Sequence, residues 1–350
     1  MTARRRTFEI GGRQVGGDAP CFVIAEAGAN HNRDLAVARA LIDAAAAAGA
    51  DAVKFQTYTG ADLYSSRTPK FEYLKDDRPI QEILDDVALP REWQPQLAEH
   101  ARERGIMWFS SPFDRAAVDT LAALGVPAIK IASFELVDLP LIRHAAATGV
   151  PLILSTGMAT YGEIDDALAA VAQAGGERVA LLRCASLYPA PPEIINLRAM
   201  ATLRDAFGVP VGLSDHTTGI SVPAGGAALG MELIEKHFTL DRSMTGPDHA
   251  FAIEPDDLTA MVRAIRDVEA ARGNGRLEGP SELERKEMYA NARRSVIAAR
   301  EIPAGTVIEP DMLTIKRPGY GIAPKYVDVV VGRTARVDIP FDEVVTWEMV

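Results

Sequence analysis

A short apolar run followed by a helix-like segment recurs eight times before residue 240, and this repeat constrains the fold more than any other feature. The runs are continuous rather than alternating, which is typical of strands buried on both faces of a parallel sheet. They occupy residues 21–26, 51–56, 106–111, 128–133, 151–156, 179–184, 209–215 and 232–237. The segments between them are rich in Ala, Leu and Glu, which favour helices. Eight such units in one chain predict a (β/α)8 TIM barrel.

The same pattern divides the chain into parts. Residues 1–272 form the predicted barrel domain, with residues 9–16 as a hairpin at its bottom, and the polar residues 273–294 read as a linker. Residues 295–350 contain short strand-like pieces separated by turns with Pro and Gly. An open doubly wound sheet is the alternative fold, but no GxGxxG fingerprint follows the first run. A β-rich domain of roughly 60 residues is marginally stable alone, so we expect it to dock against another surface.

Composition and charge narrow the classes of function. Hydrophobic residues make up 48% of the 350 residues, which argues against a disordered chain. Acidic residues outnumber basic ones by 48 to 37, and this formal charge of −11 argues against a nucleic-acid partner. No run of about 18 uncharged apolar residues occurs, so we expect no membrane span. Cys21 and Cys184 lie in apolar runs and make no disulfide framework, which favours a cytoplasmic location.

Polar side chains stand at the end of nearly every predicted strand, where TIM barrels carry their catalytic groups. They include Glu26, Lys54, Gln56, Ser111, Lys130, Ser133, Glu135, Ser155, Ser186, Tyr188, Ser214, Asp215, His216, Lys236 and His237. The alternative is that these polar side chains lie in solvent, at the beginning of the loops that follow the strands. However, Lys54, Lys130 and Lys236 lie within apolar runs, and buried ammonium groups are costly unless anions pair with them. The pattern therefore favours a cavity that binds a phosphate or carboxylate ligand.

Two histidines form a candidate metal site. His216 and His237 end the seventh and eighth predicted strands, which are neighbours in a closed barrel. Two imidazoles side by side can bind a divalent metal, although ordinary hydrogen bonding is the open alternative. Glu26 ends the first strand, which closes against the eighth, so it is a candidate third ligand or general base. Cys184 is not expected to be a nucleophile, because no base is marked beside it.

Ten motifs in order carry a resemblance that covers nearly the whole chain. They are AEAGANHN, ADAVKFQTYT, SSPFD, KIASFELVDLPLI, LSTGMAT, SLYPAPP, GLSDHT, IEKHFTLD, GPDHAF and KRPGYG. In these motifs the chain resembles the sialic acid synthase family, including its C-terminal antifreeze-like (SAF) domain. The resemblance implies condensation of phosphoenolpyruvate (PEP) with an N-acetylated amino sugar, assisted by a divalent metal such as Mn, Mg or Co. It also implies a domain-swapped homodimer.

The resemblance also implies roles for individual residues. His216 and His237 match the metal ligands, and Glu26 matches the carboxylate that moves a proton or orients sugar and water. The positions that match the PEP site are Lys54, Ser111, Lys130, Ser133, Ser155 and Ser214. Gln56, Tyr188 and Asp248 match or adjoin sugar-side positions. Arg317 matches an arginine that reaches the active site of the partner subunit.

Departures from the family pattern bear on the sugar. Phe134 replaces a glycine of N-acetylneuraminate synthases, and Ser186 replaces an asparagine. A bulky apolar side chain favours a sugar with a methyl group. The motifs KIASFE, DLPLI, YPAPP and RPGYG together most resemble the pseudaminic acid synthase branch, whose sugar is 2,4-diacetamido-2,4,6-trideoxy-L-altrose. His249 departs from that branch, which leaves legionaminate and N-acetylneuraminate synthases as alternatives. Other open classes are an aldolase-type lyase with a Schiff-base lysine, Lys130 or Lys236, and a non-catalytic carbohydrate-binding protein.

Overall fold

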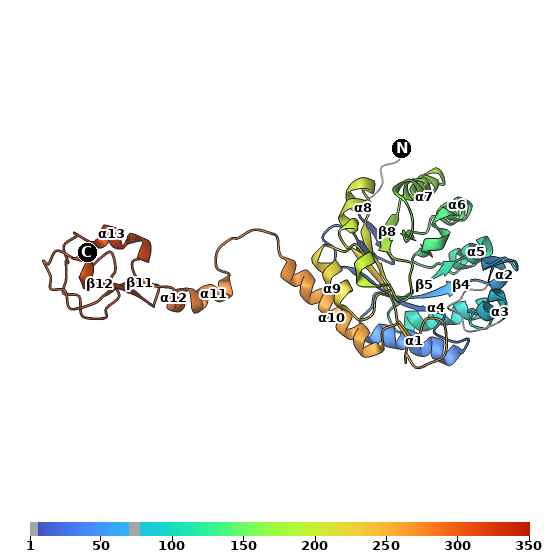
Figure 1. Ribbon diagram of the computed structural model, residues 1–350, viewed down its shortest axis with the longest axis horizontal. Helices are drawn as coiled ribbons and strands as arrows, with labels where there is room; N and C mark the ends of the chain where they lie inside the picture. The colour runs from blue at the N-terminus through green and yellow to red at the C-terminus, as the bar shows by residue number, and fades with distance from the viewer. Residues whose placement is uncertain (1–5, 70–77) are drawn as a thin grey trace. The chain divides into compact units, whose positions relative to one another are not determined.

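The computed structural model of the protein describes residues 6–69 and 78–350. The chain divides into two compact units, Met1–Gly273 and Asn274–Val350, and each has its own hydrophobic core (Figure 1). Across the described ranges, no helix combines the length and the apolar character that a membrane crossing requires.

Within residues 6–69 and 78–350, eight parallel strands close into a barrel, which confirms the predicted (β/α)8 fold. The strands follow one another around the barrel in chain order, and the last pairs with the first. They are β3 (Phe22–Gly28), β4 (Ala52–Thr57), β5 (Met107–Pro112), β6 (Ile129–Ile131), β7 (Leu152–Ser155), β8 (Val179–Cys184), β9 (Val211–Asp215) and β10 (Leu233–His237). The predicted hairpin is also present, formed by β1 (Phe8–Ile10) and β2 (Arg13–Val15).

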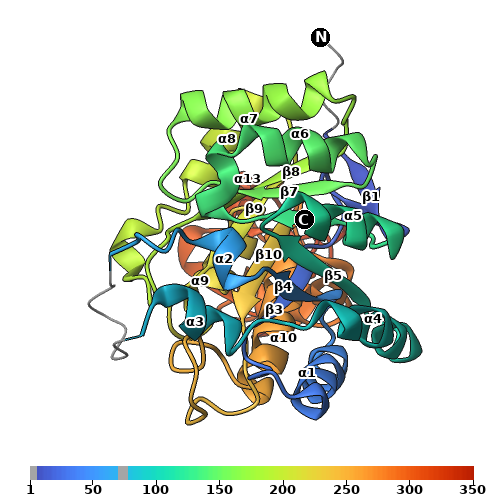
Figure 2. The same cartoon turned by 90° about the vertical axis from the view of Figure 1, so that its right-hand side faces the viewer.

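Helices surround the barrel (Figure 2) and bury their apolar faces against it. They are α1 (Leu35–Ala47), α4 (Gln94–Glu103), α5 (Arg115–Ala123), α6 (Leu139–Ala147), α7 (Tyr161–Gln173), α8 (Ala199–Phe207), α9 (Ser221–Ala228) and α10 (Pro255–Arg272). The short helices α2 (Gly60–Leu63) and α3 (Ile80–Asp85) follow β4. Local sequence begins the helices: Asp34 caps α1, and Thr160 and Glu163 form a capping box at α7.

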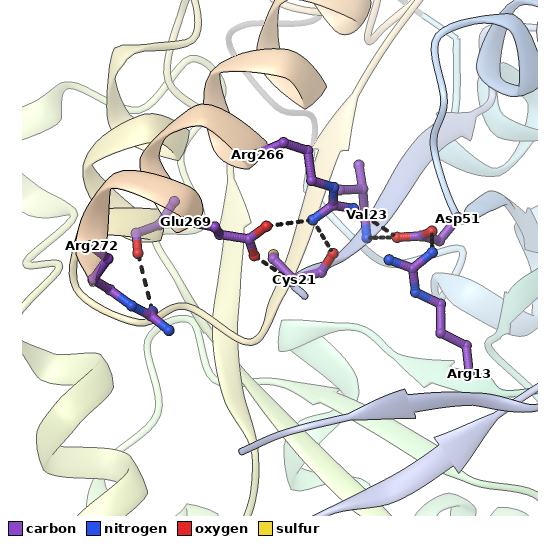
Figure 3. A network of polar contacts seen from close by, with 8 residues as sticks. Arg13, Cys21, Val23, Asp51, Arg266, Glu269 and Arg272 are labelled. Carbon is purple, nitrogen blue, oxygen red and sulfur yellow. Dashed lines mark hydrogen bonds and ion pairs between the residues drawn. The ribbon is translucent and has the colours of Figure 1, made fainter. Parts of the chain in front are cut away.

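A polar network ties the amino-terminal edge of the barrel to its last helix (Figure 3). The Asp51 carboxylate accepts a hydrogen bond from the Val23 N–H at 2.7 Å and pairs with Arg13 of the hairpin. Arg266 of α10 lies 3.5 Å from the same carboxylate and is itself paired with Glu269 at 2.9 Å. This edge is opposite the carboxyl ends of the strands, so the network is expected to support stability rather than chemistry.

Replacing Asp51 with alanine should therefore lower the free energy of unfolding of the barrel by about 2–4 kcal/mol, because a buried N–H and two guanidinium groups lose their acceptor. Chemical denaturation measures this loss. The matched control is Asp86→Ala, since the exposed Arg78–Asp86 pair is worth at most about 1 kcal/mol. Equal stabilities of the two variants would contradict the role given to Asp51.

The second unit has less regular structure than its sequence predicts. Strands β11 (Ser295–Ala298) and β12 (Leu313–Lys316) pair antiparallel, and the core packs around them. The expected strand-like pieces at 301–308 and 329–340 contribute isolated bridges, such as Ile302 with Ile339. Prolines interrupt these pieces, and a proline has no N–H to donate to a ladder. The short helix α13 (Val327–Val330) takes up the first two residues of the second piece, with Val330 buried.

The segment 273–294, predicted as a linker, contains two short helices in its described residues. They are α11 (Glu282–Lys286) and α12 (Met288–Ala292). Ser281 and Glu284 form a capping box that begins α11, a local signal that the linker interpretation overlooked.

Candidate active site

Two lysines and two carboxylates form a buried ionic cluster inside the barrel. Lys54 Nζ lies 2.7 Å from Glu26 Oε2 and 3.6 Å from Glu235 Oε1. Lys130 Nζ lies 3.7 Å from Glu235 Oε2. Each of these residues is at most 4% exposed, so the charges meet in a medium where an unpaired charge is costly. The structure thus brings together Glu26, Lys54 and Lys130 and adds Glu235 to them.

Burial and pairing shift the pKa values of the cluster. Burial raises the pKa of Glu26 to about 7, against the opposing attraction of Lys54. Burial lowers the pKa of Lys130, whereas in Lys54 the attraction of Glu235 and Glu26 outweighs burial and raises the pKa. In Glu235, burial is outweighed by Lys130 and Lys54, which hold the pKa below its usual range. Glu26 is therefore the member of the cluster that can exchange a proton near neutral pH.

Glu235 is the site residue that sequence reasoning missed. It precedes the dipeptide Lys236-His237, and in the sequence the three polar residues look like one solvated strand end. A signal was available, because side chains alternate along a strand. If His237 faces the barrel interior, then Glu235 does so too.

The expectation that Lys236 shares a cavity with Lys54 and Lys130 is wrong. Its Nζ lies 2.5 Å from Asp215 Oδ2 and donates to the Thr217 carbonyl at 2.7 Å. Alternation turns Lys236 away from the side that Glu235 occupies. The ammonium group is therefore committed to its own buried pair and does not join Lys54 and Lys130.

The two histidines lie side by side with ring centroids 5.3 Å apart. His216 Nδ1 lies 2.8 Å from the Ala185 carbonyl, and since a carbonyl only accepts, Nδ1–H donates. In the neutral form of this ring, Nε2 is then the nitrogen with the free lone pair. His237 Nδ1 is buried and makes no hydrogen bond with the described residues, and the nearest carboxylate oxygen, Asp248 Oδ2, lies 3.5 Å away. Burial holds the pKa of His237 well below its usual range, so this imidazole is neutral.

This donor set fits a metal that takes two protein ligands. Both imidazoles can present a nitrogen lone pair, which is the form that binds divalent metals. In the part of the chain that the structure describes, no group of three or more His, Cys, Asp or Glu side chains is placed to hold a metal. The described residues therefore do not group Glu26 with the two imidazoles as a third ligand.

The predicted serines supply hydroxyl groups around the lysines. Ser111 Oγ accepts a hydrogen bond from Lys54 at 3.1 Å, and Ser133 Oγ accepts one from the Gly157 N–H at 3.1 Å. Ser155 and Ser186 have buried hydroxyl oxygens without a hydrogen-bond partner among the described residues. Ser214 is buried on β9 directly before Asp215, which faces Lys236, so alternation turns Ser214 toward the interior.

Two of the three residues predicted for the sugar side, Gln56 and Asp248, converge at Gly28. A Cβ atom built there would lie 3.2 Å from Asp248 Oδ2, 3.3 Å from Glu26 Oε1 and 3.4 Å from Gln56 Nε2. Gln56 also donates to Glu26 at 2.8 Å. Gly28 has a φ of +52°, so this position both needs a glycine and keeps the space between three polar side chains open.

An aromatic group borders the histidines. Tyr188 packs on His216 with ring centroids 4.3 Å apart, and Phe251 packs on His237 at 5.1 Å. Tyr188 is 43% exposed and Phe134, which follows β6, is 52% exposed, so both can meet a ligand that enters from solvent.

His249 is fully buried, which decides how it can affect specificity. Its Nδ1 contacts Thr239 Oγ1 at 2.6 Å and its Nε2 contacts Asn32 Oδ1 at 3.2 Å. The ring therefore pins the loop that carries Asp248 instead of lining the cavity itself.

Cys184 has a base beside it, contrary to expectation, since its Sγ lies 3.8 Å from His216 Nδ1. That nitrogen already donates to Ala185, and Cys184 is 1% exposed, so the geometry still does not favour a nucleophile. Arg317 lies exposed on the second unit, directly after β12.

Comparisons with known proteins identify the family of this chain. The NeuB family model matches residues 41–277 and the SAF domain model matches residues 293–350. N,N'-diacetyllegionaminic acid synthase of Legionella pneumophila is 40% identical, with 95% of each chain covered. Pseudaminic acid synthase of Campylobacter jejuni is 37% identical over 93% of this chain and 95% of that one.

A solved structure is similar as well. The crystal structure of N-acetylneuraminic acid synthetase from Leptospira borgpetersenii, in complex with citrate, superposes with a TM-score of 0.72 at 33% identity. The match covers 82% of this chain and 97% of that one. The chain therefore belongs to the NeuB family of nonulosonic acid synthases and carries a C-terminal SAF domain.

Proposed function

We propose that the protein condenses PEP with 2,4-diacetamido-2,4,6-trideoxy-L-altrose and releases pseudaminic acid and phosphate. The observation that carries this proposal is the cluster of two buried lysines and two carboxylates together with two imidazoles that lie side by side. Membership in the NeuB family favours this synthase reaction over the Schiff-base lyase and the binding protein considered above.

Lys54 and Lys130 bind the anionic PEP. PEP carries a carboxylate and a phosphate, and each needs cations and hydroxyl donors. The buried hydroxyls of Ser155 and Ser186 have no hydrogen-bond partner within residues 6–69 and 78–350 and can donate to such a ligand, while Ser111, Ser133 and Ser214 complete the set. Glu235 keeps both lysines charged and paired in the absence of PEP.

His216 and His237 hold a divalent metal ion, Mn, Mg or Co. When bound, the metal supplies Lewis-acid activation and orientation of the open-chain sugar aldehyde. The chain would contribute the two imidazoles, and the Ala185 carbonyl holds His216 Nδ1–H, so that Nε2 is the nitrogen left for the metal.

Glu26 handles the proton. The PEP methylene carbon forms a bond to the aldehyde carbon, whose oxygen takes up one proton and becomes a hydroxyl. Water adds to the former enol carbon, and the bond from that carbon to the phosphate oxygen breaks. The water oxygen stays on that carbon as the ketone oxygen, while one of its two protons balances the proton taken up by the aldehyde oxygen and the other leaves with phosphate. The added water must lose a proton, and the Glu26 carboxylate, with its pKa near 7, accepts it. Gln56 and Asp248, which converge with Glu26 at Gly28, orient the sugar hydroxyls.

The identity of the sugar rests on Phe134. Its exposed ring offers an apolar surface to the methyl group of a 6-deoxy sugar. The sugar precursor of legionaminic acid is the second candidate substrate. The N,N'-diacetyllegionaminic acid synthase of Legionella pneumophila is 40% identical to this chain, against 37% for the pseudaminic acid synthase of Campylobacter jejuni.

The decisive experiment measures phosphate release from PEP by EDTA-treated enzyme with and without Mn²⁺. The panel contains the altrose derivative, its legionaminate counterpart and N-acetylmannosamine. Metal-dependent release with the altrose alone would support the proposal, whereas release with N-acetylmannosamine alone would overturn the role of Phe134. Release with none of the three sugars would overturn the synthase assignment.

We also propose that two copies assemble with exchanged SAF domains. Exposed apolar side chains follow β6, β7 and β8 at the mouth of the barrel, and this apolar rim consists of Phe134, Val137, Met158, Tyr161 and Leu187. The second unit exposes Val307, Tyr320 and Phe341. Exposed apolar side chains of this kind mark interaction sites, so the SAF domain of a partner subunit is the proposed cover for the rim.

A cytoplasmic location stays a prediction, in keeping with two buried free cysteines.

Arg317→Ala tests the exchanged domain. We expect the KM for the sugar to rise about 10-fold, with the KM for PEP changed less than about 2-fold, because the arginine acts on the sugar side. Steady-state kinetics with each substrate varied in turn measures both constants. Arg300→Ala, another exposed arginine of the same unit, is the control. Equal loss for both substrates, with loss of the dimer, would instead make Arg317 an interface residue.

A further inference from the structure

A buried ion pair lies directly behind the two histidines. Strands β9 and β10 are parallel neighbours in which Asp215 is in register with Lys236. His216 directly follows Asp215 in the chain, and His237 directly follows Lys236. The two imidazoles are also neighbours in space, so the ion pair and the histidine pair are adjacent. Because side chains alternate, the imidazoles and the ion pair lie on opposite faces of the sheet.

The ion pair holds the backbone on both sides of His216. Lys236 Nζ binds Asp215 Oδ2 at 2.5 Å and the Thr217 carbonyl at 2.7 Å. Thr217 in turn donates to the Asp215 carboxylate from its N–H and from its hydroxyl, both at 3.1 Å. The residues before and after His216 are therefore fastened to the residue before His237.

Stability alone does not account for this arrangement. Asp215, Thr217 and Lys236 are at most 2% exposed, and a buried ion pair is often no more stabilising than a well-packed apolar pair. What such a pair can supply is a defined geometry, because its charges tolerate only one arrangement in an apolar setting.

We propose that Asp215 and Lys236 are positioning residues that set the separation and orientation of the His216 and His237 imidazoles, and so the affinity for the divalent metal. The inference rests on the proposed function, since it concerns the metal assigned there. Substitution of residues that hold the ligands of a metal site in place commonly weakens metal binding about 10- to 100-fold.

The variant Lys236→Met separates positioning from simple electrostatics. Loss of a nearby cation would by charge alone strengthen Mn²⁺ binding, because like charges repel. Loss of a positioning contact weakens it. We expect the Kd of the full-length, EDTA-stripped protein for Mn²⁺ to rise at least about 10-fold, measured from the electron paramagnetic resonance signal of free Mn²⁺. The signal of bound Mn²⁺ should also broaden, because the ligand geometry becomes less uniform.

The matched control is Arg204→Met. Arg204 pairs with Glu232 at the opposite end of the same strand pair, so its loss affects β10 without touching the histidines. We expect its Mn²⁺ affinity to equal that of the wild type. Unchanged or tighter binding by Lys236→Met would overturn the positioning role.

A second variant covers the case in which Lys236→Met does not fold. Thr217→Val removes the hydroxyl bond to Asp215 without changing charge or volume. We expect it to weaken Mn²⁺ binding at least about 3-fold, and wild-type affinity would overturn the proposal. His237→Ala distinguishes failure of the proposed function: if it binds Mn²⁺ as tightly as the wild type, the metal assignment itself is wrong.

Discussion

Replacing His237 with alanine should lower metal-dependent turnover by about 10³-fold or more while the barrel stays folded. The variant keeps one imidazole, and a site that starts with two protein ligands cannot hold a metal firmly with one. Loss of Lewis-acid stabilisation raises the activation free energy by several kcal/mol, and each 1.36 kcal/mol lowers the rate about tenfold. Phosphate release from PEP with and without added Mn²⁺ measures the effect.

The matched control for His237→Ala is His144→Ala. His144 lies on α6 and pairs with Asp119, so its removal subtracts one histidine without touching the site. We expect wild-type turnover from this control and cooperative unfolding from both variants. Full turnover by His237→Ala after EDTA treatment would contradict the metal assignment.

The barrel could be predicted because parallel strands leave a strong local signal. Continuous apolar runs followed by helix formers recur often enough to identify the closed fold, and strand ends then mark the catalytic face. For Lys54 and Lys130 the same signal predicted a shared cavity, since an ammonium group inside an apolar run needs an anion. The structure supplies that anion as Glu235.

The direction of each side chain was harder to predict than its position. Glu235, Lys236 and His237 are consecutive, and only the alternation along β10 separates the inward pair from the outward lysine. Lys236 therefore looked like a site residue, and Glu235 did not. The base beside Cys184 could not be anticipated either, because Cys184 and His216 meet only once β8 and β9 lie side by side.

Glu26→Gln should change both turnover and its dependence on pH. Burial raises the pKa of Glu26 to about 7, so the carboxylate that accepts a proton in the proposed reaction is lost as the pH falls through that value. The kcat/KM of the wild type should decline below pH 7, and the variant should lack this inflection. At pH 8 we expect turnover of the variant to fall about 10²–10⁴-fold, the usual contribution of a positioned base. A wild-type profile that instead declines above pH 7 would make Glu26 the acid.

Stability gives an independent test with a fixed sign. The ordinary pKa of Glu26 is 4.5, so between about pH 4.5 and 7 the folded protein binds a proton that the unfolded chain releases. The stability that this proton contributes is complete below pH 4.5 and is lost as the pH rises through 7. Glutamine is neutral at every pH, so the free energy of unfolding of EDTA-stripped Glu26→Gln, relative to the wild type, should increase between pH 4.5 and 7 and then level off. A constant difference would mean that Glu26 stays ionised throughout, held by Lys54, and would remove the basis for its titration in catalysis.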